Sequence, residues 1–136
     1  YESGTLNVPG ILGLRAGMEF VKKKGPKRIW QEEMQKIRLL YGRLSRISRV
    51  KLYTEAPSLP WYLPVLSFTV EGMPSEAVGE ALAGAGIAVR CGLHCAPLAH
   101  DKMGTETGTV RVSPSIFTRR EEMEMLASRV RQICQK

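Results

Sequence analysis

The sequence predicts an α+β fold in which a small, mostly antiparallel sheet of about four strands carries helices packed on one face. Three observations lead to this class. Apolar residues recur at helical spacing near both ends of the chain, they alternate with polar residues in short segments between, and Gly or Pro marks the joins. A length of 136 residues suits one core, so we expect residues 1–136 to form a single domain.

The first part of the chain predicts two consecutive helices. Asn7 is a suitable N-cap, and Pro9 is tolerated in the first turn because its missing N–H would have no partner there. The apolar face of this helix consists of Ile11, Leu14, Met18 and Val21. A Gly-Pro step at 25–26 ends it, and a longer helix follows from Lys27 to about Ile47. The buried stripe of the second helix consists of Trp30, Met34, Ile37, Tyr41 and Leu44.

Four short segments predict the strands. Residues 50–53 and 66–70 alternate apolar and polar side chains, which is typical of strands with one buried face. Residues 87–89 and 109–112 predict the third and fourth strands. In the fourth, Arg111 points away from its apolar neighbours, so it is either an exposed edge charge or a clamp for a carboxylate.

Two more helices complete the predicted fold. Ser75 is expected to cap a short helix that contributes Val78 and Leu82 to the core. Thr118 and Glu121 form a capping box, which predicts the start of the last helix. The core side of that helix consists of Met123, Leu126, Val130 and Ile133.

Charge and hydropathy narrow the classes of protein. The net charge is +7, and the excess lies in residues 1–57, with 12 Lys and Arg against 5 acidic residues, whereas residues 58–136 hold 8 of each. Without interleaved aromatics or a nucleic-acid motif, we favour a solvated helical face over a nucleic-acid site. No apolar run approaches the roughly 20 residues of a membrane span, so we expect no membrane partner. The start of the chain lacks a signal-peptide pattern, and three cysteines then suit a reducing, cytoplasmic compartment.

The unusual chemistry lies in residues 89–113. Cys91, His94, Cys95 and His100 fall within ten positions, so a zinc site must be considered. A structural zinc site pairs a Cys-x(2–4)-Cys unit with a second clean ligand pair, which is missing here. Cys134 falls beside the buried stripe of the last helix, where a free Cys behaves as a small hydrophobe. We therefore predict no metal.

Cys95 is the candidate nucleophile. It follows a strand and Gly92, which permits a tight loop on which a thiol is exposed. Arg90 and His94 are close in sequence, and positive neighbours favour the reactive thiolate. The alternative for Cys95 is an inert buried thiol, and for Cys91 burial is the favoured interpretation.

Four segments of the chain resemble, in order, motifs of the cysteine desulfurases, which are pyridoxal-phosphate-dependent enzymes of fold type I in the class V aminotransferase group. Residues 1–7 resemble their E-x-G-T-x-N segment, and residues 89–96 resemble the V-R-x-G-x-H-C-A signature of the Suf-type branch. Residues 108–113 resemble the following V-R-x-S strand, and Thr118 with Glu121 and Glu122 resembles the helix start that closes the C-terminal domain.

The resemblance implies roles for five residues. Cys95 matches the cysteine that attacks the sulfur of cofactor-bound cysteine, which releases alanine and leaves a persulfide. Arg111 matches the arginine that binds the substrate carboxylate, and Arg90 and His94 would line the same site. Thr5 matches the threonine that contacts the cofactor phosphate across a homodimer. The partners implied are the N-terminal pyridoxal-phosphate domain, a second copy and a sulfur-acceptor protein, with iron–sulfur cluster assembly as the setting.

Two departures from the family pattern shape the expectations. The lysine motif that holds pyridoxal phosphate is missing from this sequence, so we expect the large cofactor domain to be absent and this chain alone to bind no cofactor and to be inactive. Pro114 and its neighbours replace the usual small-aromatic-Asn run near Arg111. A selenocysteine lyase, another class V aminotransferase and a stand-alone persulfide carrier remain alternatives.

Overall fold

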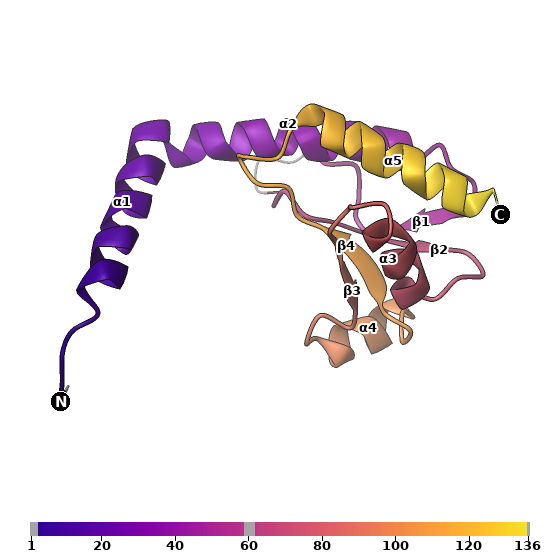
Figure 1. Ribbon diagram of the computed structural model, residues 1–136. Helices are drawn as coiled ribbons and strands as arrows, with labels where there is room; N and C mark the ends of the chain where they lie inside the picture. The colour runs from indigo at the N-terminus through magenta and orange to yellow at the C-terminus, as the bar shows by residue number, and fades with distance from the viewer. Residues whose placement is uncertain (1–2, 59–61, 136) are drawn as a thin grey trace.

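A computed structural model describes residues 3–58 and 62–135, and it confirms the α+β class (Figure 1). The helices are α1 (Val8–Lys24), α2 (Pro26–Leu44), α3 (Ser75–Ala83), α4 (Pro97–Met103) and α5 (Arg120–Cys134). The strands are β1 (Val50–Leu52), β2 (Leu66–Val70), β3 (Arg90–Gly92) and β4 (Thr109–Val112). The strands form one sheet in the order β1-β2-β4-β3, and every neighbouring pair is antiparallel.

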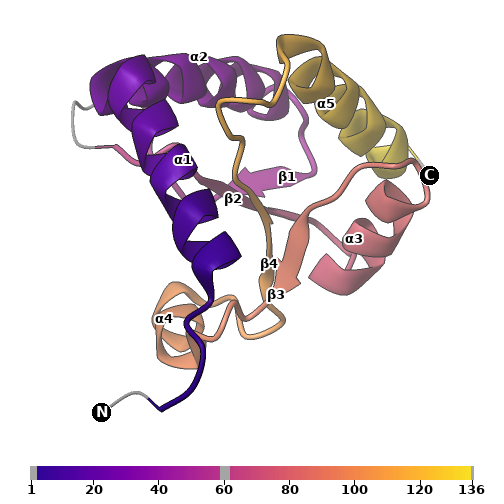
Figure 2. The same ribbon diagram turned by 60° about the vertical axis from the view of Figure 1, so that its left-hand side comes forward.

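One face of the sheet forms the core with α2, α3 and α5. Phe68 is opposite Leu52 on β1 and Val110 on β4, and both Phe68 and Val110 are fully buried. The helices contribute most of the predicted stripes, with the buried members Met34, Ile37, Leu44, Val78, Leu82, Met123, Leu126, Val130 and Ile133. On α2, Leu40 is buried although it was not predicted, and the predicted Trp30 and Tyr41 are only half-buried. In both ribbon views α2 and α5 lie on the side opposite α4 (Figure 2).

The other face of the sheet is polar. Because side chains alternate along a strand, Ser67 and Thr69 on β2 and Arg111 on β4 point away from the helix-covered core. Arg111 is paired in register with Ser67 on one side and with Arg90 on the other. This polar face therefore carries charge that the core does not neutralise.

Helix α1 extends away from the core along its whole length (Figure 1). None of its residues is buried, and three residues of its predicted apolar face, Ile11, Leu14 and Met18, are 54–66% exposed. Its end meets α2, and the ring of Phe20 stacks on Phe117 with 5.5 Å between centroids. No described helix has the combination of length and hydropathy that crossing a membrane requires.

The third strand and one helix differ from the sequence prediction. The strand was expected at residues 87–89, and this is wrong, because the N–H of buried Ile87 bonds to the Leu82 carbonyl and closes the turn after α3. Pairing with β4 starts only at Arg90. Helix α4 was not predicted, because its two turns bury no apolar stripe and Leu98 is 82% exposed.

Helix α2 and helix α3 begin or end slightly off the expected positions. Helix α2 ends at Leu44 instead of Ile47, since the Ile47 N–H bonds back to the Leu44 carbonyl in a turn. Ser75 does not cap α3, because Pro74 occupies the N-cap. The buried Ser75 hydroxyl instead lies 2.9 Å from the Thr107 carbonyl, which ties α3 to the segment before β4.

The capping box of α5 lies one residue later than the sequence suggested. The N-cap is Arg119, and the Glu122 carboxylate accepts its N–H at 2.6 Å. Thr118, the predicted cap, accepts the Ser115 N–H at 2.9 Å and closes the preceding turn. A capping box therefore starts α5 as predicted. It lies one residue later because Glu122, and not the neighbouring Glu121, accepts the N-cap N–H.

We expect Gly108→Ala to destabilise the chain by at least about 1–3 kcal/mol. Gly108 has φ +78°, and a Cβ there would lie 2.5 Å from the Gly92 backbone, so it would force β3 away from β4. Urea unfolding followed by circular dichroism measures this loss. The matched control is Gly42→Ala on α2, where nothing lies within 4 Å and the change adds about 0.5–1 kcal/mol. A Gly108→Ala chain as stable as the wild type would contradict the close-approach account.

Candidate functional site

The turn between β3 and α4 brings four predicted site residues to the polar face of the sheet. Arg90 begins β3, residues 93–96 form the turn, and Arg111 lies beside Arg90 on β4. His94 and Cys95 are in the turn itself. Strand pairing therefore gathers residues that are up to 21 positions apart in the sequence.

The backbone of the turn is strained at the candidate nucleophile. His94 has φ +53° and Cys95 has φ +61°, and both are in the left-handed region that non-glycine residues rarely adopt. Such conformations persist where the surroundings fix them, and they cluster at functional sites. Here the Ala96 N–H bonds to the Leu93 carbonyl at 2.9 Å and closes the turn around them. The Cys95 side chain is consequently held on the surface, which excludes the inert buried alternative.

A guanidinium lies next to the Cys95 sulfur. Arg90 Nη2 donates to Cys95 Sγ at 3.5 Å, and both side chains are exposed. A positive donor at this position stabilises negative charge on the sulfur, and the thiolate is the nucleophilic form of cysteine. The pair gives Cys95 the arrangement expected of a reactive thiol.

The His94 side chain lies between the turn and β4. Its Nε2 lies 3.1 Å from the Thr109 hydroxyl on β4, and its Nδ1 is buried without a hydrogen-bond partner in the described chain. Burial lowers the pKa of His94, and the positive charges of Arg111, His100 and Arg90 lower it further. His94 is therefore mainly neutral at neutral pH, and it presents a lone pair at Nδ1 when Nε2 carries the proton.

Arg90 and Arg111 are directly opposite each other in the β3–β4 ladder. Like charges in this position destabilise a sheet unless an anion lies between or above them. Neither arginine forms an ion pair with an acidic side chain of the described residues. The pair is thus suited to an anionic ligand, and the fork of a guanidinium matches a carboxylate.

Thr5 is not brought to this group of residues. It is exposed in the segment before α1, which lies far from α4 in the ribbon view (Figure 1). Tyr1 and Glu2 of the same motif lie outside the described residues. The role of Thr5 stays a prediction about an assembly that contains more than this chain.

The other two cysteines lie apart from the site. Cys91 is paired with Val110 on the core side of the sheet, and a Cβ on Gly79 of α3 would meet its sulfur. Burial raises the pKa of Cys91, with the Glu76 charge as a second cause, and burial also raises the pKa of Cys134. Within residues 3–58 and 62–135, no three His, Cys, Asp or Glu side chains form a group that could hold a metal ion.

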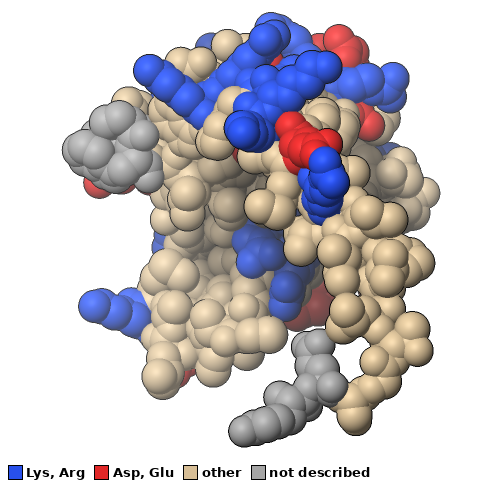
Figure 3. Space-filling view, turned by 90° about the vertical axis from the view of Figure 1, so that its left-hand side faces the viewer, with Lys and Arg blue, Asp and Glu red and all other residues tan. Residues whose placement is uncertain are grey.

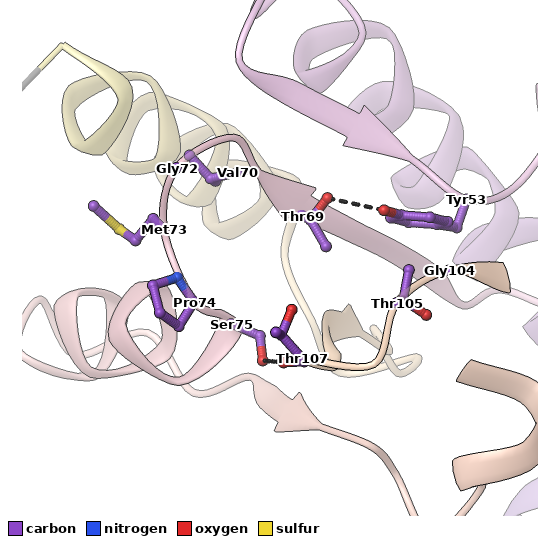
Figure 4. Close-up of a pocket in the computed structure, with 10 residues that line it drawn as sticks. All are labelled: Tyr53, Thr69, Val70, Gly72, Met73, Pro74, Ser75, Gly104, Thr105 and Thr107. Carbon is purple, nitrogen blue, oxygen red and sulfur yellow. Dashed lines mark hydrogen bonds between the residues drawn. The ribbon is translucent and has the colours of Figure 1, made fainter. Parts of the chain in front are cut away.

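A separate pocket lies at the other end of the polar face, between β2, α3 and the segment after α4 (Figure 4). Hydroxyls line much of it, and most of them already have partners, since Tyr53 bonds Thr69 at 3.2 Å and the hydroxyls of Ser75 and Thr105 bond the Thr107 carbonyl and His100. None of its ten lining residues is charged. An anion is therefore attracted more strongly to the Arg90–Arg111 pair than to this pocket, which has no charged lining residue.

The basic side chains form more than one group on the surface. Figure 3 shows a large group of Lys and Arg where α1 meets α2, with a smaller one in the hollowed middle of the same face. Lys22, Lys23 and Lys24 belong to the last turn of α1, where cations interact favourably with the helix dipole. These three lysines thus have a structural reason that is independent of the site.

Sequence reasoning did not identify two residues beside His94. Thr109 was included in a predicted strand without a role, although it is almost fully buried and bonds His94. His100 was considered only as a metal ligand, whereas it is buried against the His94 ring. The contact with Thr109 depends on how the turn folds against β4, and the contact with His100 depends on α4, a helix that carries no periodic signal.

We expect a thiol reagent to modify Cys95 at least about tenfold faster than Cys91 or Cys134 at neutral pH. Cys95 is exposed, while the other two thiols are half-buried with raised pKa values. Peptide mapping after brief iodoacetamide treatment measures the three rates, and Cys95→Ser should remove the fast phase. Equal rates for Cys91 and Cys95 would contradict the assigned exposure.

His94 should make the chain less stable in acid. Its pKa is lowered from an ordinary 6.5 in the folded state, so below about pH 6.5 the unfolded chain binds more protons and stability falls. His94→Gln should therefore lose less stability than the wild type between about pH 7.5 and pH 5. Urea unfolding at both pH values tests this. Identical losses of stability in the two chains would show that folding does not lower the pKa of His94.

Comparison with known proteins identifies the family. The chain matches the family described as aminotransferase class-V over residues 1–126. It is 40% identical over 133 residues to a cysteine desulfurase of Synechococcus elongatus, and this match covers 98% of this chain and 21% of the relative. It is also 31% identical over 136 residues to a probable cysteine desulfurase of Methanothermobacter thermautotrophicus, which covers 98% of this chain and 33% of the relative.

Solved structures agree with this match. The apo structure of a cysteine desulfurase from Thermococcus onnurineus superposes with a TM-score of 0.89 at 30% identity, over 98% of this chain and 33% of the other. The cysteine desulfurase CsdA from Escherichia coli superposes with a TM-score of 0.85 at 25% identity, over 98% of this chain and 32% of the other. The chain spans about a fifth to a third of the length of these proteins. It belongs to the aminotransferase class-V family, and the relatives that it resembles are cysteine desulfurases.

Proposed function

We propose that this chain supplies the sulfur-accepting part of a pyridoxal-phosphate-dependent cysteine desulfurase, which converts L-cysteine to L-alanine and leaves a persulfide on Cys95. The observation that carries the proposal is the exposed Cys95 thiol with Arg90 Nη2 at 3.5 Å, where Arg90 is paired with Arg111 and neither arginine has an acidic partner among the described residues. The names of the relatives favour cysteine desulfurase over a selenocysteine lyase or a stand-alone carrier.

The sulfur transfer needs no external oxidant. The Cys95 thiolate attacks the sulfur of the substrate, so an S–S bond forms while the bond between that sulfur and the substrate Cβ breaks. The electron pair of the broken bond stays with carbon, which gains a proton and leaves as alanine. Arg90 stabilises the negative sulfur before the attack, and the exposed turn leaves room for the substrate.

Arg111 is proposed to bind the substrate carboxylate, with Arg90 and His94 lining the same site. A fork of N–H donors on a rigid central strand suits a planar carboxylate. An anion bound there would also relieve the repulsion between the paired arginines. His94, mainly neutral, can accept a proton at its unpartnered Nδ1 during the reaction.

The residues present fit one side of a pyridoxal-phosphate site. The two guanidiniums suit an anionic ligand above the polar face, whereas Nδ1 of His94, which finds no partner among the described residues and is an acceptor in the neutral ring, suits a donor group. When bound, this cofactor supplies an electron sink for bonds broken on the substrate. Thr5 is proposed to donate to the cofactor phosphate of a second subunit. We expect the isolated chain to hold no cofactor and to be inactive, because the remaining two thirds or more of its relatives carry the other side of the site.

The proposed partners follow from two exposed features. Helix α1 presents apolar side chains that no part of the described chain covers, which supports packing against the N-terminal cofactor domain and a second copy in a homodimer. The exposed Cys95 sulfur supports transfer to a separate sulfur-acceptor protein. We place these reactions in the cytoplasm, where thiols stay reduced.

The test uses the full-length protein that carries this chain. Cys95→Ala should reduce persulfide formation and alanine release by at least about 10²-fold, because Cys91 and Cys134 lie apart from the site. Binding of the cofactor, followed by its visible absorbance, should be unchanged. Cys91→Ala is the matched control, since Cys91 lies on the core side, and its activity should stay within a few fold of the wild type.

Two outcomes would overturn the proposal. Wild-type rates of alanine release in the Cys95→Ala protein would remove the role of Cys95. Full activity of residues 1–136 alone would show that the rest of the protein is not needed.

A further inference from the structure

A buried histidine on α4 lies against the proposed site and has no part in the reaction described so far. His100 is only 3% exposed, although histidine is seldom so fully buried on a two-turn helix at the surface. Burying an imidazole costs free energy unless its polar atoms find hydrogen-bond partners. The residues around His100 supply such partners.

Thr105 fixes the tautomer of His100. The His100 Nδ1 atom lies 3.1 Å from the Thr105 carbonyl and 2.8 Å from the Thr105 hydroxyl. A carbonyl only accepts, so Nδ1 carries the proton and Nε2 holds the lone pair of the neutral ring. The Thr105 N–H donates back to the His100 carbonyl at 2.9 Å. These bonds tie the ring and the backbone of His100, near the end of α4, to Thr105.

The same residue is connected to the backbone next to the candidate nucleophile. The His100 N–H donates to the Ala96 carbonyl at 3.3 Å, and the Ala96 N–H donates to the Leu93 carbonyl at 2.9 Å. Cys95 lies inside this second bond, in a backbone conformation that needs support from its surroundings. A shift of α4 therefore moves the turn that carries the thiol.

The ring of His100 also packs on the ring of His94. Their centroids are 5.7 Å apart and the planes are inclined by 48°. Thr109 holds the other side of the His94 ring at Nε2, while Nδ1 finds no hydrogen-bond partner in residues 3–58 and 62–135. The orientation of His94 thus depends on one hydrogen bond and on the ring behind it.

We infer that His100 is a positioning residue, which holds the His94 ring and the Cys95 turn in place for the reaction. Its catalytic consequence rests on the proposed function, whereas its effect on His94 does not. Since the two described histidines form no group of three metal-capable side chains, the pair is not explained as a metal site.

The expected electrostatic effect follows from the groups that face His94. These are Arg111 on β4, Arg90 on β3 and His100 on α4, and each lowers the pKa of His94, while burial is the larger cause. Removing His100 takes away part of the cover over His94, and it also removes the positive charge that repels a protonated His94 whenever the His100 ring is itself protonated. The pKa of His94 should therefore rise when His100 is replaced, with both arginines still present.

The test compares three variants in the full-length protein with 13C-labelled histidines. His100→Asn keeps an N–H for the Thr105 carbonyl but removes the ring behind His94, so the His94 pKa should rise and kcat should fall about tenfold with KM within about twofold. His100→Phe restores the ring without the hydrogen bond, and it should recover part of kcat. Thr105→Val keeps the ring and lowers stability, but it should leave the titration of His94 unchanged.

The readouts separate the possible failures. Unchanged His94 titration and unchanged kcat in His100→Asn would overturn the inference, as would a loss of kcat that disappears after correction for the folded fraction. If Cys95→Ala retains activity while His100→Asn still shifts the His94 titration, then the proposed function fails and the positioning of His94 stands.

Discussion

The close approach of β3 to β4 is the constraint on which the site depends. Gly92 and Gly108 meet backbone to backbone, at a distance that no side chain tolerates, and this contact sets the register in which Arg90 is opposite Arg111. The same register turns Cys91 into the core and directs the chain into the strained turn at Cys95. A shift of one residue would exchange the two faces of the strand and bury the arginine.

Charge on the polar face has a consistent logic. The sheet pairs two cations there, a neighbouring histidine loses its proton readily, and the candidate thiol lies within reach of a guanidinium. Each feature alone has an ordinary explanation, since arginines occur on strand edges and histidines are often half-buried. Together they favour an anionic ligand on this face, next to the exposed Cys95 sulfur.

The sequence was informative wherever periodicity or a local motif carries the signal. Most of the stripe of α2 from Met34 to Leu44 and the alternation around Phe68 were predictable from spacing. Spacing and neighbours left Cys95 open between an exposed and a buried thiol, and the structure shows that it is exposed. The strand at Arg90–Gly92 was not, because apolar Ile87 serves the turn after α3 instead of the ladder. The contact between His94 and His100 was also hidden, since it depends on how a short helix without a stripe folds back. The sequence thus predicted which residues carry the chemistry, but it did not predict which residues contact them in the fold.

Helix α1 gives the chain an uneven distribution of stability. A helix of 17 residues without one buried side chain gains little from tertiary packing, which supplies most of the stability of helices in proteins. Amide hydrogen exchange should be slow in the strands and fast along α1, so local opening there costs little compared with global unfolding. Whatever covers its apolar side chains then also folds it, and slower exchange in α1 becomes a direct measure of assembly.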